Sequence, residues 1–191
     1  MILSDVSIWK ALDEGTLKVF PLYEDSVKTD AIDLHLSPIL GNMRWDKFPR
    51  IDPRHIPDGL VEHFEMKPGG FWLRPHQCIL GATVEHVILP NNLTAQLDGK
   101  STIGRLFLKN HSQAGRIDAG FSGTITFEIS NDSGSTILLY PDMPIAQLVF
   151  EQLTTSARYP YGHVSSKSHY QGQVIPMPPA SLPLARVMEE D

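Results

Sequence analysis

The sequence has a single cysteine, Cys78, among its 191 residues. One cysteine cannot form an intramolecular disulfide, and it cannot supply the paired thiolates of a structural zinc site. The eight histidines contain no H-x-x-x-H pair of the kind that places two metal ligands on one helical face. The sequence therefore predicts a reduced chain that binds no zinc.

Long hydrophobic runs are also missing, because no apolar stretch approaches the roughly 20 residues that span a bilayer. No secretory signal opens the chain, so the expected location is the cytoplasm. Basic residues are in the minority: 16 Lys and Arg stand against 22 Asp and Glu, for a formal net charge of −6. Neither a membrane segment nor a general nucleic-acid surface is expected.

What is present is the composition of one globular domain. Hydrophobic residues make up 41% and charged residues 20% of the chain, which is ordinary for a soluble protein. The length fits a single domain over residues 1–191.

One helix and several short strands are predicted. Ser4 is a suitable N-cap and Gly15 a natural stop for a short N-terminal helix. Ile32–Leu36 alternates apolar and polar residues, the period of a half-buried strand. Further β-rich runs cover residues 78–84, 94–98, 123–130, 136–140 and 145–150. With 15 prolines and 14 glycines interrupting the chain, a mainly β barrel or sandwich is expected.

Two regions are expected to be irregular. Residues 42–59 are rich in Pro, Arg and Asp and predict a long loop. From about residue 156 onward the composition is typical of a flexible segment, which can also become ordered over a ligand.

A carboxylate stands on one of the predicted strands. Alternation within residues 123–130 puts Ile125, Phe127 and Ile129 on one face and Glu128 on the other. A carboxylate held rigidly by a strand suits a general base. A solvent-facing strand acid gives the same pattern, so both interpretations stand at this point.

Two segments before this strand have unusual compositions. Asp98–Arg105 combines glycines, hydroxyls and cations as an anion-binding turn does, without the spacing of a Walker A loop. His111–Gly123 contains two Ala-Gly pairs around Ile117 and Asp118, which predicts a tight hairpin. Its small residues would let a flat base approach the backbone, and Asp118 would accept a hydrogen bond from a sugar hydroxyl. A solvated turn and a plain hairpin are the alternatives.

Taken in order, these segments resemble the dCTP deaminases of the trimeric dUTPase superfamily. The resemblance rests on Gly-Lys-Ser-Thr-Ile-Gly-Arg at 99–105, the hairpin at 111–123, Thr-Phe-Glu at 126–128 and Tyr-Gln-Gly-Gln at 170–173. It extends over nearly the whole chain, from Ile2 to Gln173. Dedicated dUTPases typically lack both Arg105 and Glu128. The resemblance implies a distorted dUTPase-like β-barrel (β-clip) with a short N-terminal helix.

The same resemblance implies a reaction and a set of site residues. Glu128 would be the general base for deamination of dCTP to dUTP and ammonia, with Ser101 and Arg105 orienting the water and balancing charge. The implied substrate-binding residues are Lys100, Thr102, Ala114, Gly115, Asp118, Gln147, Tyr161, His169 and Gln173. No zinc is implied, unlike in the zinc nucleobase deaminases. The implied partners are Mg²⁺ carried by the triphosphate, two further copies in a homotrimer with shared sites, and dTTP as a feedback inhibitor.

Two positions depart from the family pattern. His169 stands where a lysine is usual, with Lys167 two residues earlier, and Gln113 replaces a usual threonine. Three functions remain: deamination that releases dUTP, which the sequence favours; a bifunctional reaction that continues to dUMP and diphosphate; and nucleotide binding without turnover. Gly115 argues for the second, because deaminases that release dUTP can carry histidine there. The sequence does not distinguish dCTP from a modified dCTP as substrate.

Overall fold

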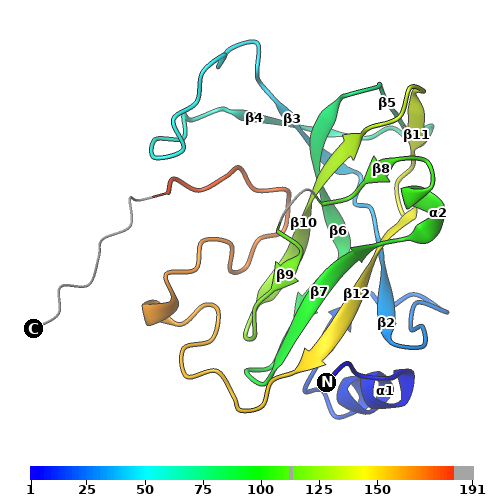
Figure 1. Ribbon diagram of the computed structural model, residues 1–191, viewed down its shortest axis with the longest axis vertical. Helices are drawn as coiled ribbons and strands as arrows, with labels where there is room; N and C mark the ends of the chain where they lie inside the picture. Colours follow the sequence, from blue (N-terminus) through cyan, green and yellow to red (C-terminus); the bar gives the residue numbers. More distant parts are fainter. Residues whose placement is uncertain (112–113, 183–191) are drawn as a thin grey trace, which may run out of the picture.

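The computed structural model describes residues 1–111 and 114–182, so Gln113 lies outside the described residues. Its helices are α1 (Asp5–Asp13), the single turn α2 (Ser101–Gly104) and a 3-10 turn at Val164–Ser166. Its strands are β1 (Lys18–Phe20), β2 (Ala31–His35), β3 (Ile39–Met43), β4 (Val61–Glu65), β5 (Phe71–Leu73), β6 (Cys78–Ile88), β7 (Leu93–Gly99), β8 (Leu108–Lys109), β9 (Arg116–Ile117), β10 (Ser122–Asn131), β11 (Ile137–Leu139) and β12 (Pro144–Gln152). The mainly β architecture with a short N-terminal helix, predicted from the sequence, is confirmed (Figure 1).

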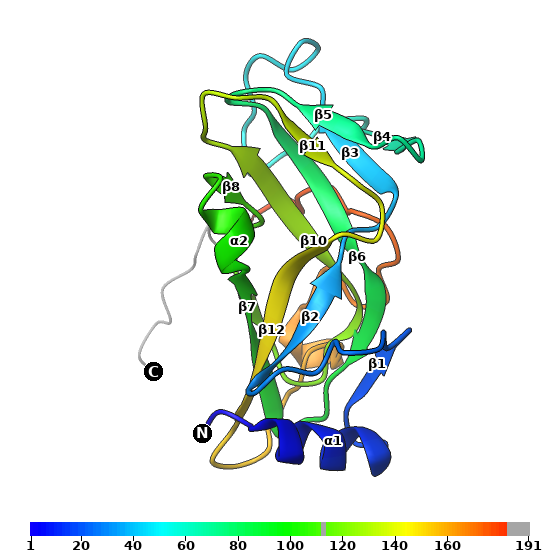
Figure 2. The same cartoon turned by 90° about the vertical axis from the view of Figure 1, so that its right-hand side faces the viewer.

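Two larger sheets enclose the hydrophobic core. The six-stranded sheet follows the order β4-β3-β6-β10-β8, with β1 also paired to β6, and the four-stranded sheet follows β2-β12-β7-β9. A two-stranded sheet, β11-β5, lies at one end (Figure 2). Phe127 of β10 and Phe150 of β12 are both fully buried in the same cluster. Their contact with one core is what holds the two sheets together.

For the N-terminal helix, the structure supports the predicted role of Gly15 at the end more clearly than the predicted role of Ser4 at the start. Ser4 occupies the N-cap position but makes no side-chain hydrogen bond to the helix. Gly15 follows the C-cap residue Glu14 and has a φ of 68°, the left-handed conformation that commonly ends a helix. Among the described residues, no helix has the length and apolar character that a membrane crossing requires.

Two local predictions differ in part from the structure. The sequence predicts a half-buried strand at 32–36, but β2 is buried on both faces. Asp33 is only 7% exposed, since its carboxylate accepts hydrogen bonds from Lys100 (2.7 Å) and Gln147 (3.0 Å) inside the protein. The predicted turn at 98–105 is instead the end of β7 followed by α2.

A second buried acid links the two sheets. Glu85 of β6 is 1% exposed and accepts hydrogen bonds from the backbone N–H of His35 (3.0 Å) and from its Nδ1 (2.5 Å). Burial raises the pKa of the Glu85 carboxyl above its usual range, and the bonds from His35 oppose that shift.

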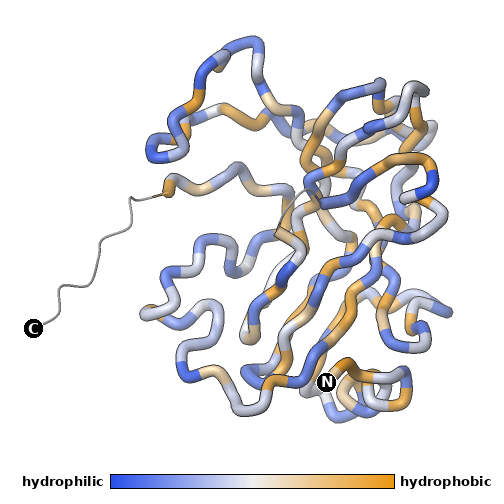
Figure 3. The backbone as a smooth tube through the Cα atoms, in the orientation of Figure 1, coloured by the Kyte–Doolittle hydropathy of each residue, from blue (hydrophilic) through white to orange (hydrophobic). Residues whose placement is uncertain are grey.

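The C-terminal segment, defined here as residues 156–182, runs along the outer side of β10. Its backbone pairs with that strand at Gly172, whose N–H donates to Ser122 (2.7 Å), and at Gln173, whose carbonyl accepts from Thr124 (2.9 Å). Figure 3 shows it mostly in white and blue, in contrast to the alternating strands of the core. Hydrogen bonds, more than apolar packing, therefore hold this segment in place.

Candidate active site

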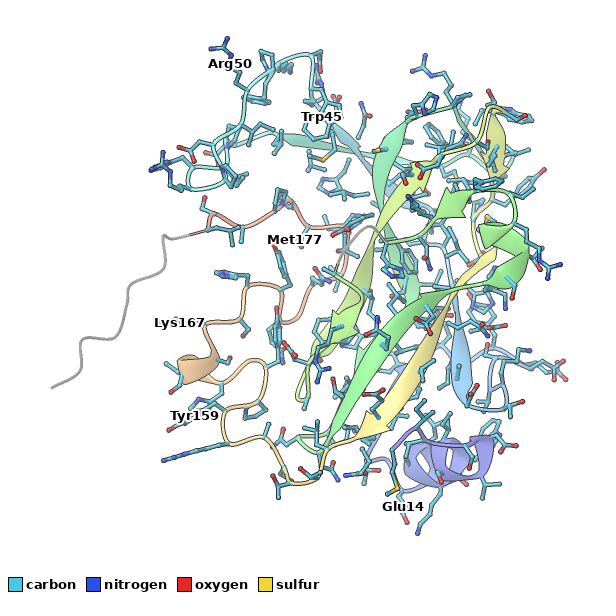
Figure 4. All side chains as sticks on the ribbon, in the orientation of Figure 1. Glu14, Trp45, Arg50, Tyr159, Lys167 and Met177 are labelled. Carbon is cyan, nitrogen blue, oxygen red and sulfur yellow. The ribbon has the colours of Figure 1, made fainter. Side chains whose placement is uncertain are left out.

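A cavity of about 880 Å³ lies between β10, the β9 hairpin and the C-terminal segment. Figure 4 labels Tyr159, Lys167 and Met177 on that segment, and all three line the cavity. Half of the predicted site residues also line it, namely Ala114, Asp118, Glu128, Tyr161, His169 and Gln173. Residues up to 59 positions apart in the sequence, from 114 to 173, are thus brought to one cavity.

Glu128 is half-buried on the cavity face of β10. Its neighbours Phe127 and Ile129 are fully buried in the core, as the predicted alternation requires, whereas Ile125 lines the cavity beside a register shift between Thr124 and Thr126. Its backbone N–H donates to the carbonyl of Asn110 (3.1 Å), and it lies opposite Leu80 of β6, which also lines the cavity. The strand therefore presents a carboxylate from a rigid backbone beside an apolar wall.

The turn after β9 forms the next wall. Asp118 is exposed and lines the cavity, and its Oδ1 lies 3.6 Å from Nε of Arg116. Gly120 has a φ of 87°, and a Cβ added there would lie 2.6 Å from the Cβ of Pro160. Glycine at this position therefore allows the C-terminal segment to approach, where the N–H of Tyr161 donates to Ala119 (2.8 Å).

The opposite wall is built by the C-terminal segment. The hydroxyl of Tyr161 accepts a hydrogen bond from the backbone N–H of Tyr170 (2.9 Å). Gln173 donates from Nε2 to the Thr124 carbonyl (2.6 Å), so its side chain fastens the segment to β10. Lys167 lines the cavity together with His169. A lysine is thus available near the position where the family usually has one.

The other half of the predicted residues does not line this cavity; these are Lys100, Ser101, Thr102, Arg105, Gly115 and Gln147. Ser101, Thr102 and Arg105 are exposed on or beside α2. Figures 1 and 2 place α2 on the opposite side of the molecule from the C-terminal segment. Within one chain, Glu128 and the Ser101–Arg105 turn therefore belong to different surfaces.

Asp33 is a residue of this second surface that the sequence prediction missed. It accepts hydrogen bonds from both Lys100 and Gln147, two of the predicted substrate-binding residues, and Nζ of Lys28 lies 3.8 Å from its Oδ2. The available signal was an acid between Ile32 and Leu34 in an otherwise apolar run. A buried acid of this kind requires cationic or hydrogen-bonding partners.

Comparison with known proteins identifies the family. The family model described as dCTP deaminase-like matches residues 2–153. The chain belongs to the dCTP deaminase-like family. This finding confirms the resemblance drawn from the sequence motifs.

Curated relatives extend the match over nearly the whole dCTP deaminase-like chain. A Corynebacterium kroppenstedtii protein named dCTP deaminase, dUMP-forming, is 42% identical over 174 residues, 91% of this chain and 93% of its own length. A Thermobifida fusca protein of the same name is 42% identical over 184 residues, with 95% and 93% covered.

A solved structure shows the same fold. The 2′-deoxycytidine 5′-triphosphate deaminase of Agrobacterium tumefaciens aligns with a TM-score of 0.62 and 22% identity, over 79% of this chain. Only 47% of that protein is covered, so the dCTP deaminase-like chain spans about half its length.

Proposed function

We propose that this chain converts dCTP to dUMP, by hydrolytic deamination of the base and release of diphosphate. The observation that supports this most is the composition of the cavity wall. Glu128 lies on β10, Asp118 on the β9 turn, and the side chains of Lys167 and His169 on the C-terminal segment. A carboxylate base, a sugar acceptor and phosphate partners are therefore arranged around one nucleotide-sized space.

In the deamination step, water adds to C4 of cytosine. Glu128 accepts a proton from that water and passes it to the amino group, which leaves as ammonia and gives dUTP. Ser101 and Arg105 orient the water and balance the charge of the tetrahedral adduct. Ala114 contacts the base through its backbone, and Asp118 accepts the 3′-hydroxyl of the sugar.

The position of Ser101 and Arg105 supports a shared site. Because these residues lie on the far surface of the same chain, a second copy must supply them to the Glu128 cavity. Leu106 and Phe107 follow Arg105 and are 51% and 68% exposed, an apolar surface suited to contact between copies. We therefore propose a homotrimer in which each chain gives Glu128 to one site and α2 to the next.

The remaining binding residues hold the phosphates in this proposal. Lys100, Thr102 and Gln147 would come from the second copy, while Tyr161, His169 and Gln173 come from the C-terminal segment. Among the described residues, no three His, Cys, Asp or Glu side chains are grouped as a metal site. The amine, hydroxyl, imidazole and amide groups of these binding residues fit a triphosphate that brings its own Mg²⁺, which would supply charge stabilisation during phosphate cleavage. Inhibition by dTTP stays a prediction.

Continuation to dUMP is supported by the relatives and by the packing of Gly115. The sequence alone favours release of dUTP, whereas the curated relatives from Corynebacterium kroppenstedtii and Thermobifida fusca carry the name dUMP-forming. A Cβ on residue 115 would lie 2.5 Å from Nε2 of Gln96 and 3.0 Å from the Leu97 carbonyl. This conformation has no room for the histidine that deaminases releasing dUTP can carry at this position.

The product assay is the first test. Incubation of the wild-type chain with dCTP and Mg²⁺ should yield dUMP, diphosphate and ammonia in equal amounts, because one dCTP and two waters balance these three products. Chromatography of the nucleotides together with a diphosphate assay measures this. Accumulation of dUTP without diphosphate would show that the chain carries out only the deamination step. Absence of any turnover would contradict the proposal.

The Gly115→Ala variant tests the second step. Because the added methyl group meets Gln96 and Leu97, residues 114–115 should move, and the ratio of dUMP to dUTP should fall about tenfold. Time courses of both nucleotides measure the ratio. Gly134→Ala is the matched control, since no atom lies within 4 Å of its added Cβ. An unchanged ratio in Gly115→Ala would show that packing at this position does not govern diphosphate release.

A further inference from the structure

We propose that Asn110 is a positioning residue for deamination, which fixes the Lys100–Arg105 turn relative to the strand that carries Glu128. The inference rests on the proposed function, because it assigns a role within that site. Asn110 is 4% exposed, lies directly after β8 and does not line the cavity. Any effect on the reaction must therefore pass through the groups that it holds.

The side-chain amide of Asn110 bridges two strands where their ladder ends. Its Nδ2 donates to the carbonyl of Asp98 at the end of β7 (3.2 Å) and to the carbonyl of Ile145 at the start of β12 (3.3 Å). The antiparallel β7–β12 ladder ends with the pair Gly99 and Ala146; Asp98 lies one residue inside this end and Ile145 one residue outside it. The amide thus fastens β7 two residues before Lys100 and three before Ser101.

Asparagine suits this position chemically. Its NH₂ group has two N–H donors for two carbonyls, and its Oδ1 lies 3.0 Å from Nδ1 of His111. Because Nδ2 faces two acceptors, Oδ1 must accept from His111, which places a proton on Nδ1 of that ring. A carboxylate would repel both carbonyls, and a hydroxyl would satisfy only one of them.

The backbone of the same residue holds the catalytic strand. The carbonyl of Asn110 accepts the N–H of Glu128 (3.1 Å), continuing the short β8–β10 ladder of Lys109 with Ser130. One buried residue therefore contacts the strand of the base by its main chain and, by its side chain, the part of β7 that leads into the turn of Ser101 and Arg105. A small shift at Asn110 would change the relative placement of both surfaces.

In the proposed trimer, Glu128 and the Ser101–Arg105 turn of one chain belong to two neighbouring sites. Asn110 connects these two parts of the chain. A displacement on the order of 1 Å in a catalytic arrangement lowers turnover by about 100-fold. Loss of the amide bridge should accordingly lower kcat for dCTP by more than it changes KM, because Glu128 and Arg105 act on the reacting atoms, whereas Lys100 and Thr102 share phosphate binding with residues of the C-terminal segment that Asn110 does not hold.

The test compares Asn110→Asp with Asn131→Asp. Asn131 is also fully buried, and its Nδ2 also bridges two carbonyls, those of Leu73 (2.9 Å) and Ser135 (2.8 Å). Both substitutions should lower Tm, because both place a carboxylate against two carbonyls. Only Asn110→Asp should lower kcat, by about 10- to 100-fold with KM changed less than about threefold, when each variant is assayed well below its Tm.

Asn110→Thr keeps the proposal testable if Asn110→Asp does not fold. Its hydroxyl donates to one carbonyl without adding charge, so kcat should fall by about three- to tenfold. Wild-type kcat in the folded Asn110 variants, or an equal fall in Asn131→Asp, would overturn the positioning role alone. A wild-type chain that does not turn over dCTP in the same assay would overturn the proposed function, and the positioning role with it.

Discussion

Replacing Glu128 by Gln should abolish deamination while the chain remains folded. Glutamine keeps the size of the side chain and its hydrogen bonding but cannot accept the proton of the attacking water. Loss of a general base typically lowers the rate by about 10²- to 10⁴-fold. The rate of ammonia release from dCTP at saturating substrate, compared between wild type and variant, measures this decrease directly.

Glu65→Gln is the matched control, because Glu65 is an exposed strand carboxylate on β4 that does not line the cavity. It should retain wild-type turnover. The Tm of both variants should stay close to that of the wild type, since neither carboxylate is fully buried. Near-wild-type turnover in Glu128→Gln would remove Glu128 from the mechanism and leave it as a surface acid of β10.

Mixed assemblies of two inactive variants should regain activity. Glu128→Gln chains retain Arg105, and Arg105→Ala chains retain Glu128, so a site formed between one chain of each kind contains both groups. Random association at equal amounts would restore about a quarter of the sites over all threefold assemblies, and about a third of the sites in the assemblies that contain both kinds of chain. Co-expression with two different affinity tags, followed by sequential purification and the ammonia assay, measures this recovery.

The negative control for this experiment combines Glu128→Gln with a chain that carries both substitutions. No site in that mixture contains Glu128, so no activity should return. If the mixture of single variants is equally inactive although both tags co-purify, Glu128 and Arg105 do not act at a site shared between chains. The separation of α2 from the cavity would then need another explanation.

Local patterns were sufficient to predict most of the fold. Period-2 alternation located β10 and the side of it that carries Glu128, because burial of one face determines which residues alternate. The position of β12 followed from the β-rich composition of residues 145–150. Glycine marked the end of α1 for a different reason, its tolerance of positive φ at Gly15.

The parts that the sequence did not predict depend on contacts between distant residues. In the sequence, Asp33 resembles a solvent-exposed strand residue. In the structure, it accepts hydrogen bonds from Lys100, which follows β7, and from Gln147 of β12. Similarly, Asn110 carries no motif, and its role comes from carbonyls of two strands that converge on it. That Ser101 and Glu128 lie on different surfaces is also a tertiary property, because short-range patterns do not report which elements meet across a sheet.

The ion pair between Lys100 and Asp33 has a consequence for ligand exchange. In the proposed site, a triphosphate that binds Lys100 must compete with the Asp33 carboxylate, whose Oδ2 lies 2.7 Å from Nζ of Lys100. The cost of breaking this ion pair offsets part of the attraction between Lys100 and the phosphates. Asp33 is not left unpaired in the exchange, because Lys28 at 3.8 Å and Gln147 at 3.0 Å stay beside it. When diphosphate departs, Asp33 draws Lys100 back. We therefore expect this acid to act as an internal competitor that shortens the residence time of anionic products.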